Sequence, residues 1–162
     1  MSAMGTFTSP SSGAALPPSE APPSDLSPSP PGFVSGEYSA LGAVLVVDDD
    51  VHVRRVARRV LLHAGFSVIE ASGGEEALAA LRDESVRVAC AVVDVTMPGM
   101  DGPTCAEHLR QLRPELPVLF CSGYSADESV PGTFDARTAF LPKPYRQRDL
   151  VDHVASLLGP AT

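Results

Sequence analysis

The sequence predicts an α/β fold in which a parallel sheet carries helices on both faces. From residue 43 onward, short apolar runs alternate with segments of helical period. Five strand and helix units in succession are typical of a parallel sheet. Acidic, hydroxyl and lysine residues follow the apolar runs, at the strand ends where open α/β sheets bind their ligands. The fold class therefore already indicates where a functional site would lie.

The first strand is expected at 43–47, where the run Val44-Leu45-Val46-Val47 is apolar throughout. The helix that follows is expected at 51–64, because its apolar residues recur at helical spacing and Asp50 can cap it. The remaining strands are expected at 66–70, 88–93, 117–121 and 138–141, and the remaining helices at 74–83, 103–113 and 146–158. Pro103 suits the first turn of its helix. Residues 125–136 are poorly patterned, because Val130-Pro131-Gly132 interrupts a helix there.

The first forty residues differ in composition from the rest of the chain. They hold eight of the sixteen prolines, many serines, and only three charged residues, Glu20, Asp25 and Glu37. Such a segment buries too little apolar surface to fold, so residues 1–40 are expected to be a disordered tail and residues 41–162 one domain. No secretory signal and no run of roughly 20 apolar residues is present, so a soluble, cytoplasmic protein is expected, away from the membrane. The chain stops after the last predicted helix, so we expect a stand-alone domain without an output domain.

The charge and the cysteines exclude several kinds of function. Residues 41–162 contain seventeen acidic and twelve basic side chains, a net charge of −5, which argues against binding to nucleic acid. Cys90, Cys105 and Cys121 are odd in number and widely spaced, so neither a disulfide framework nor a cysteine metal site is indicated. They are expected to be small buried residues.

The chain contains a single lysine, Lys143, beside eleven arginines. A lysine ammonium can approach a phosphoryl oxygen as a point charge, whereas arginine is a planar fork. Asp48 and Asp49 follow one predicted strand and Asp94 ends another, so the sheet would bring three carboxylates to the lysine. These four residues indicate a phosphoryl-transfer site.

Four motifs in order then identify a family resemblance over Val44 to Leu158. They are Val46-Val47-Asp48-Asp49-Asp50, Asp94 to Gly102, Cys121-Ser122-Gly123-Tyr124, and Phe140-Leu141-Pro142-Lys143-Pro144. The chain resembles the receiver domain of two-component response regulators. The resemblance implies a flavodoxin-like, doubly wound five-stranded sheet of order 2-1-3-4-5. The Ser-Gly-Tyr motif is similar to that of receivers that work with hybrid sensor kinases.

The resemblance also implies the role of each site residue. Asp94 would accept a phosphoryl group from a phosphohistidine on a partner. Asp49, Asp94 and the Thr96 backbone carbonyl would ligate Mg²⁺ directly, and Asp48 would act through a bound water. An oxygen-only set with retained waters suits Mg²⁺. Lys143 and the Ser122 hydroxyl would contact the phosphoryl oxygens, with Phe140 at the family's switch aromatic position. Thr96 and Tyr124 would tune hydrolysis, because a large ring at 124 should obstruct the attacking water.

Partners and oligomeric state follow from the same resemblance. The implied partners are a histidine kinase or histidine phosphotransfer protein and a downstream protein that the sequence does not name. The basic residues Arg54, Arg55, Arg58 and Arg59 on the first helix form either a solvated face or a docking surface for that partner. Many relatives dimerise through the region that Val130-Pro131-Gly132 interrupts, so we expect a monomer.

Two alternatives remain beside the phosphoacceptor. An Asp-nucleophile phosphatase of the haloacid-dehalogenase type would need a second acid two residues after its nucleophile, where this chain has Thr96. We therefore expect no enzyme activity of its own. An unphosphorylated receiver-fold scaffold is the second alternative, and its expected signature is the loss of an acid or of the lysine. Neither is lost here.

Overall fold

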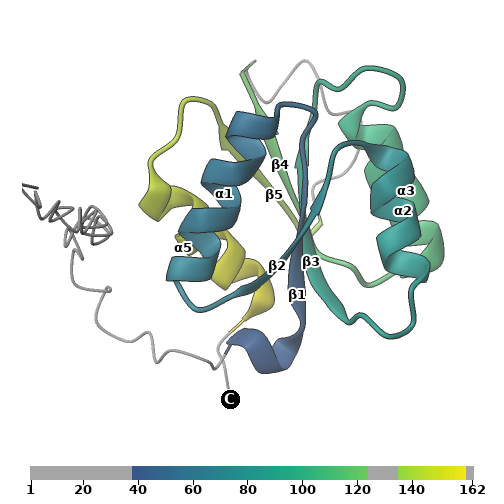
Figure 1. Ribbon diagram of the computed structural model, residues 1–162, viewed down its shortest axis with the longest axis horizontal. Helices are drawn as coiled ribbons and strands as arrows, with labels where there is room; N and C mark the ends of the chain where they lie inside the picture. Colours follow the sequence, from purple (N-terminus) through teal and green to yellow (C-terminus); the bar gives the residue numbers. More distant parts are fainter. Residues whose placement is uncertain (1–37, 124–134, 160–162) are drawn as a thin grey trace, which may run out of the picture.

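The computed structural model describes residues 38–123 and 135–159, and it contains the predicted parallel sheet (Figure 1). The sheet has the order β2-β1-β3-β4-β5, which confirms the predicted topology. Its strands are β1 (Ala43–Val47), β2 (Ser67–Ala71), β3 (Val88–Asp94), β4 (Val118–Ser122) and β5 (Thr138–Pro142). The helices are α1 (Val51–His63), α2 (Gly74–Arg82), α3 (Gly102–Leu112) and α5 (Gln147–Leu158), preceded by the 3₁₀ helix η1 (Tyr38–Leu41).

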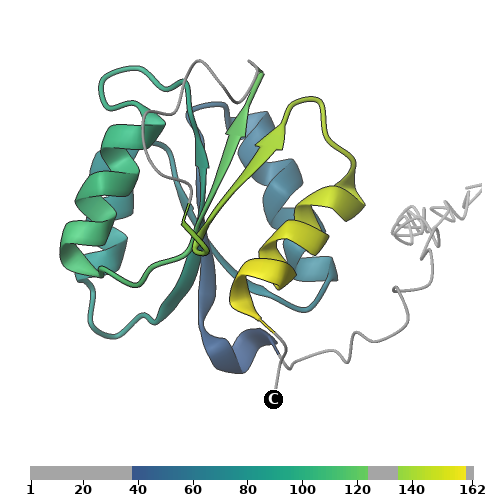
Figure 2. The same ribbon diagram turned by 180° about the vertical axis from the view of Figure 1, so that it is seen from behind.

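The helices cover both faces of the sheet (Figures 1 and 2). On one face, α1 and α5 pack against the inner strands through residues such as Leu61 and Leu150. On the other face, α2 and α3 pack through residues such as Leu109. Strand β1 is buried along its whole length, because its side chains alternate between the two cores. Each fully buried valine or leucine contributes about 1.5–3 kcal/mol relative to an exposed one.

Side-chain caps fix the starts of α1 and α3, the helices that follow the strands carrying the aspartates. Asp50 accepts hydrogen bonds from the backbone N–H of His52 at 2.8 Å and of Val53 at 3.3 Å, which confirms its predicted role as the cap of α1. Asp101 accepts from the N–H of Thr104 at 2.8 Å and caps α3, a role that the sequence analysis did not assign. Pro103 lies in the first turn of α3, as predicted.

The element boundaries differ from the predicted ones by at most one residue at either end. Strand β2 begins at Ser67, because the N–H of Phe66 is bonded to the Leu61 carbonyl at 3.0 Å and closes the end of α1 instead. The chain leaves α1 through Gly65, which has φ of 95°. Most of the segment predicted to be poorly patterned, including Val130-Pro131-Gly132, lies outside the described residues.

The fold includes residues that the sequence analysis had assigned to the tail. Helix η1 begins at Tyr38, whose ring lies 4.5 Å from that of Phe66, centroid to centroid. The Ser39 hydroxyl donates to the carbonyl of Gly65 at 3.3 Å. The domain therefore includes Tyr38, three residues before the predicted boundary at residue 41. In the part of the chain that is described, no helix combines the length and the apolar character needed to cross a membrane.

Candidate functional site

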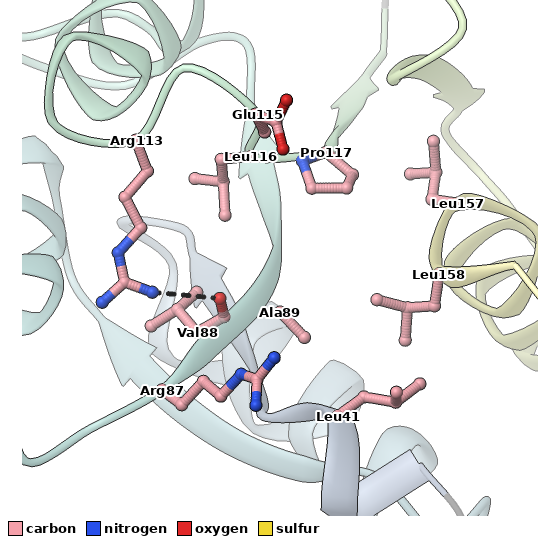
Figure 3. Close-up of a pocket in the computed structure, with 10 residues that line it drawn as sticks. All are labelled: Leu41, Arg87, Val88, Ala89, Arg113, Glu115, Leu116, Pro117, Leu157 and Leu158. Atoms are coloured by element: carbon pink, nitrogen blue, oxygen red, sulfur yellow. Dashed lines mark hydrogen bonds between the residues drawn. The ribbon is translucent and has the colours of Figure 1, made fainter. Parts of the chain in front are cut away.

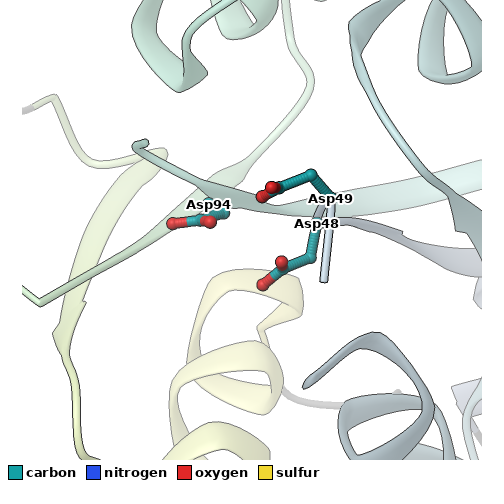
Figure 4. Close-up of side chains that lie close together, drawn as sticks. All are labelled: Asp48, Asp49 and Asp94. Atoms are coloured by element: carbon teal, nitrogen blue, oxygen red, sulfur yellow. The ribbon is translucent and has the colours of Figure 1, made fainter. Parts of the chain in front are cut away.

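Three carboxylates meet at the carboxyl ends of β1 and β3 (Figure 4). The two strands are parallel neighbours, and Val47 is in register with Val93, so Asp48 and Asp94 leave the sheet side by side. Asp48 is 5% exposed and Asp94 8% exposed, whereas Asp49 faces solvent. One carboxylate oxygen of each residue lies within 4.8 Å of the others.

Lys143 completes the cluster from the end of the edge strand β5. It follows β5, and its Nζ lies 3.3 Å from Oδ2 of Asp48 and 3.5 Å from Oδ1 of Asp94. Its backbone N–H donates to the carbonyl of Ser122 at 2.7 Å, which fixes the start of the loop to the end of β4. The Lys143-Pro144 peptide bond is cis. The predicted convergence of Asp48, Asp94 and Lys143 is therefore present in the structure.

Burial and charge perturb the titration of these groups in opposite ways. Burial raises the pKa of Asp94, the neighbouring Asp48 charge adds to the rise, and Lys143 only partly offsets it. Burial acts to lower the pKa of Lys143, but the carboxylates of Asp48 and Asp94 together outweigh it, so the pKa lies above its ordinary value. The lysine is therefore held in its charged form, whereas the three carboxylates carry more negative charge than the lysine can neutralise.

The donor set fits a hard divalent cation. Asp48, Asp49 and Asp94 offer only oxygen ligands, and with Lys143 they carry a formal charge of −2 that one divalent ion would cancel. The backbone N–H of Thr96 donates to Oδ1 of Asp94 at 3.3 Å, so the loop after β3 folds back over the carboxylate. The Thr96 side chain is exposed.

The predicted switch residues lie on the two strands beside the cluster. Ser122 ends β4 and is fully buried, one residue beyond the pair formed by Asp94 and Cys121. Phe140 lies on β5, is partly buried, and packs against the core beneath α2 and α3. Tyr124, to which the sequence analysis gave a role in hydrolysis, lies outside the described residues.

The four arginines of α1 separate into two pairs. Arg54 and Arg58 are paired with Glu70 of β2 at 3.5 Å and 3.3 Å. Arg54 also donates to the backbone carbonyl of Asp48 at 2.7 Å, so it supports the acidic turn directly. Arg55 and Arg59 face solvent, and no ion pair joins either of them to the described part of the chain. A docking surface on α1 would therefore present Arg55 and Arg59 unpaired, whereas Arg54 is held against the sheet by Glu70 and the Asp48 carbonyl.

Gly102 supports the site in a way that the sequence analysis missed. Its N–H donates to the carbonyl of Val95 at 2.9 Å, which seats the start of α3 on the end of β3. A Cβ at this position would overlap the carbonyl oxygen of Asp94 and lie 2.7 Å from Cα of Val95. Gly99 is the residue of this loop with positive φ, at 82°, so an unusual backbone angle does not explain the glycine at 102. The reason for a glycine at 102 is close packing, which shows only in three dimensions.

Comparison with known proteins agrees with this geometry. The family model of the response regulator receiver domain matches residues 44–155. Sensor kinase CckA of Brucella abortus is 38% identical over 125 residues, which cover 75% of this chain and 13% of CckA. Response regulator MprA of Mycolicibacterium vanbaalenii is 37% identical over 120 residues, 74% of this chain and 51% of MprA. The chain thus spans about half of the length of MprA and a smaller share of the length of CckA.

Solved structures give the same result. The receiver domain of the hybrid histidine kinase CckA is 36% identical, with a TM-score of 0.62, over 73% of this chain and 100% of that one. The response regulator TrrA of Thermotoga maritima, in complex with Mg²⁺ and BeF, is 26% identical, with a TM-score of 0.62, over 72% of this chain and 98% of that one. A CheX-CheY-BeF₃-Mg²⁺ complex from Borrelia burgdorferi is 26% identical, with a TM-score of 0.64, over 74% of this chain and 90% of that one. With the acidic cluster, the lysine and the sheet order in place, the chain belongs to the response regulator receiver domain family.

Proposed function

We propose that this chain accepts a phosphoryl group on Asp94 from a phosphohistidine of a histidine kinase or phosphotransfer protein. The observation that carries the proposal is the position of Lys143, whose Nζ lies within 3.5 Å of both Asp94 and Asp48 in a largely buried acidic cluster. Family membership implies interaction with kinases or phosphotransfer proteins. The choice of Asp94 as the acceptor is ours.

Asp94 is the acceptor because it ends the central strand β3, next to both the lysine and the other acids. In the transfer, a carboxylate oxygen of Asp94 forms a bond to phosphorus while the bond from phosphorus to the partner's imidazole nitrogen breaks. The electron pair of the broken bond stays on that nitrogen. Such a step depends on positioning and charge neutralisation rather than on covalent help from the protein. Lys143 is already held charged beside Asp94, so it needs little movement to pair with a phosphoryl oxygen.

Asp48, Asp49 and Asp94, with the Thr96 carbonyl, are the residues that would hold Mg²⁺. When bound, the ion would neutralise the excess negative charge that otherwise opposes the arrival of a phosphoryl group. Receiver domains bind Mg²⁺ at their acidic pocket, and TrrA is described as a complex with Mg²⁺ and BeF. Arg54 contributes from outside the ligand set, because its guanidinium holds the Asp48 carbonyl and so the turn that carries Asp48 and Asp49.

Ser122, Lys143 and Phe140 form the proposed response to phosphorylation. Ser122 and Lys143 are joined through the backbone at 2.7 Å, so a phosphoryl group that draws both side chains inward would pull the ends of β4 and β5 together. Phe140 lies on β5, partly buried, and would turn further inward as Ser122 moves. It lacks a phenol oxygen, so the ring acts by packing alone.

The alternatives are weaker on the same observations. A scaffold that is never phosphorylated does not need Lys143 poised between two buried carboxylates, yet the ion pairs are present. A phosphatase with an Asp nucleophile would need an acid at position 96, where Thr96 stands, so we propose no enzyme activity. The signal would pass to a downstream protein by direct contact, and the protein would act as a monomer. Its kinase partner would be cytoplasmic and would dock over Arg55 and Arg59.

The proposal is tested by incubating the full chain with acetyl phosphate and Mg²⁺ and measuring its intact mass. We expect one added phosphoryl group on the wild type, none on Asp94→Asn, and none on the wild type when a chelator replaces Mg²⁺. Asp101→Asn is the matched control, because it changes a nearby aspartate that caps α3 and keeps an efficient capping residue. Equal labelling of Asp94→Asn and the wild type would overturn the assignment.

A further inference from the structure

A pocket of about 420 Å³ lies at the amino ends of β3 and β4, opposite the strand ends that carry the aspartates. Figure 3 shows the residues that line it. It opens beside the starts of β3 and β4, between the end of η1, the segment that follows α3, and the last turn of α5. Its volume is in the range of pockets that hold a small ligand or a buried side chain. It shares no residue with the acidic site, so it needs a separate explanation.

The lining of this pocket combines an apolar surface with cationic groups. Leu41, Leu116, Leu157 and Leu158 supply apolar walls, and Arg87 and Arg113 stand at the side near β3. Arg113 donates to the carbonyl of Val88 at 3.4 Å, and no carboxylate within the described ranges pairs with Arg87 or Arg113. Glu115, the acid of the lining, is directed to Arg137, 3.4 Å away. The surface is therefore suited to a segment that combines an apolar side chain with a neighbouring acidic one.

The chain itself enters the fold at the edge of this pocket. Helix η1 is anchored by Tyr38 on Phe66 and ends at Leu41, a residue of the pocket wall. The residues just before it read Pro31-Gly32-Phe33-Val34-Ser35-Gly36-Glu37. Phe33 and Val34 are an apolar pair between two glycines, and the first 37 residues contain three acids and no lysine or arginine. Both the apolar character and the charge of this segment complement the pocket.

We propose that Phe33 and Val34 of the chain's own N-terminal segment dock in this pocket, with an acid of the segment facing Arg87 or Arg113. Phe33 is five residues before Tyr38, and five extended residues span at most about 17 Å, enough to fold back across η1. A short tether of this kind gives an effective concentration in the millimolar range, so even weak apolar docking would be populated. The docking does not depend on phosphorylation of Asp94.

The chain offers a clean way to test this. Burial raises the pKa of the Cys90 and Cys121 thiols to about 12 and that of Cys105 to about 11, so a new exposed cysteine can be labelled selectively. A nitroxide on Ser29→Cys of the full chain lies four residues from Phe33 but nine from the anchored Tyr38. We expect the amide signals of Ala89 and Leu158, beside the pocket, to lose most of their intensity. The amide of Glu75, at the start of α2, should lose little.

The matched control is the same labelled chain with Phe33→Ser and Val34→Ser, which keeps the tether and removes the apolar pair. Docking predicts that the signals of Ala89 and Leu158 recover in this control, and that they recover partly with Arg87→Glu. Loss of signal that is equal with and without Phe33 and Val34, or no loss at all, would overturn the proposal. A mixture of spin-labelled chain and separate isotope-labelled chain detects docking between molecules. Equal broadening there would identify a second copy as the occupant and would also overturn docking within one chain.

Discussion

Substituting Gly102 by alanine tests how closely α3 is seated on the strand that carries Asp94. The added Cβ would lie 2.7 Å from Cα of Val95 and closer still to the carbonyl oxygen of Asp94, and real Cβ atoms essentially never approach other atoms to within 3.0 Å. Both neighbours are backbone atoms, so no flexible side chain can yield. Gly102 does not have positive φ, so the substitution introduces a contact rather than an unfavourable backbone angle.

The expected cost is the balance of two opposite effects. Overpacking of this kind destabilises a protein by about 1–3 kcal/mol. Alanine favours a helix interior over glycine by up to about 1 kcal/mol, and less in the first turn. The net loss should be about 1–2 kcal/mol, which for a domain of this size lowers the melting temperature by about 4 °C per kcal/mol. Because the Asp94 backbone must move, the rate of phosphorylation should fall as well.

Guanidinium unfolding of the full chain, followed by circular dichroism, measures this loss. Gly73→Ala is the matched control, because no atom lies within 4 Å of its Cβ position and its backbone is extended, with φ of −177°. Gly73 is the N-cap of α2, where alanine is less favourable than glycine, so we expect Gly73→Ala to lose about 0.5–1 kcal/mol, less than Gly102→Ala. If Gly102→Ala proved as stable as Gly73→Ala, the close approach of α3 to Asp94 would be refuted.

Three further substitutions have defined outcomes. Lys143→Arg should still be phosphorylated but should couple phosphorylation to conformation less well, because a wider guanidinium misplaces the contact to the phosphoryl oxygen; equal phosphate-dependent amide shifts in variant and wild type would contradict this. Arg110→Lys should lose about 1–2 kcal/mol of stability, because the Arg110 guanidinium donates to the Leu116 and Arg137 carbonyls and to the hydroxyl of Thr138. In the same unfolding experiment, Arg148→Lys, at an exposed position, should change the stability by less than about 0.5 kcal/mol. Tyr124→Ala should shorten the lifetime of the phosphoryl group if the ring shields it from water; timing phosphate loss in one Mg²⁺ buffer decides this, and equal or slower loss in the variant would count against shielding.

The sheet and the acidic cluster were predictable because both follow from short stretches of sequence. Apolar runs of five or so residues bounded by polar ones define β1 and β3. Residues that follow parallel strands meet where the carboxyl ends of those strands lie together. This places Asp48, Asp94 and Lys143 together without any knowledge of loop geometry. The cap at Asp50 was predictable for a similar reason, since a cap bonds to N–H groups only two or three residues away. The order of the strands came from the family resemblance.

The features that were missed depend on contacts between distant parts of the chain. The separation of Arg54 from Arg55 depends on the position of Glu70, which no pattern within α1 reveals. The requirement for a glycine at 102 depends on the path of β3 beneath α3. The packing of Tyr38 on Phe66 joins residues that are 28 positions apart. Tyr38 belongs to a segment whose composition is typical of disorder. In each case the local sequence permits several arrangements, and packing selects one.

The central claim, that Asp94 is the phosphoacceptor, is tested most directly by locating the acyl phosphate chemically. After incubation with acetyl phosphate and Mg²⁺, borohydride reduces a phosphorylated aspartate to homoserine and leaves free aspartates unchanged. Peptide mass spectrometry then reads the modified position. We predict homoserine at position 94 alone, and none when Mg²⁺ is removed. Homoserine at position 48 or 49, or the absence of homoserine from a chain that has taken up phosphate, would contradict the account.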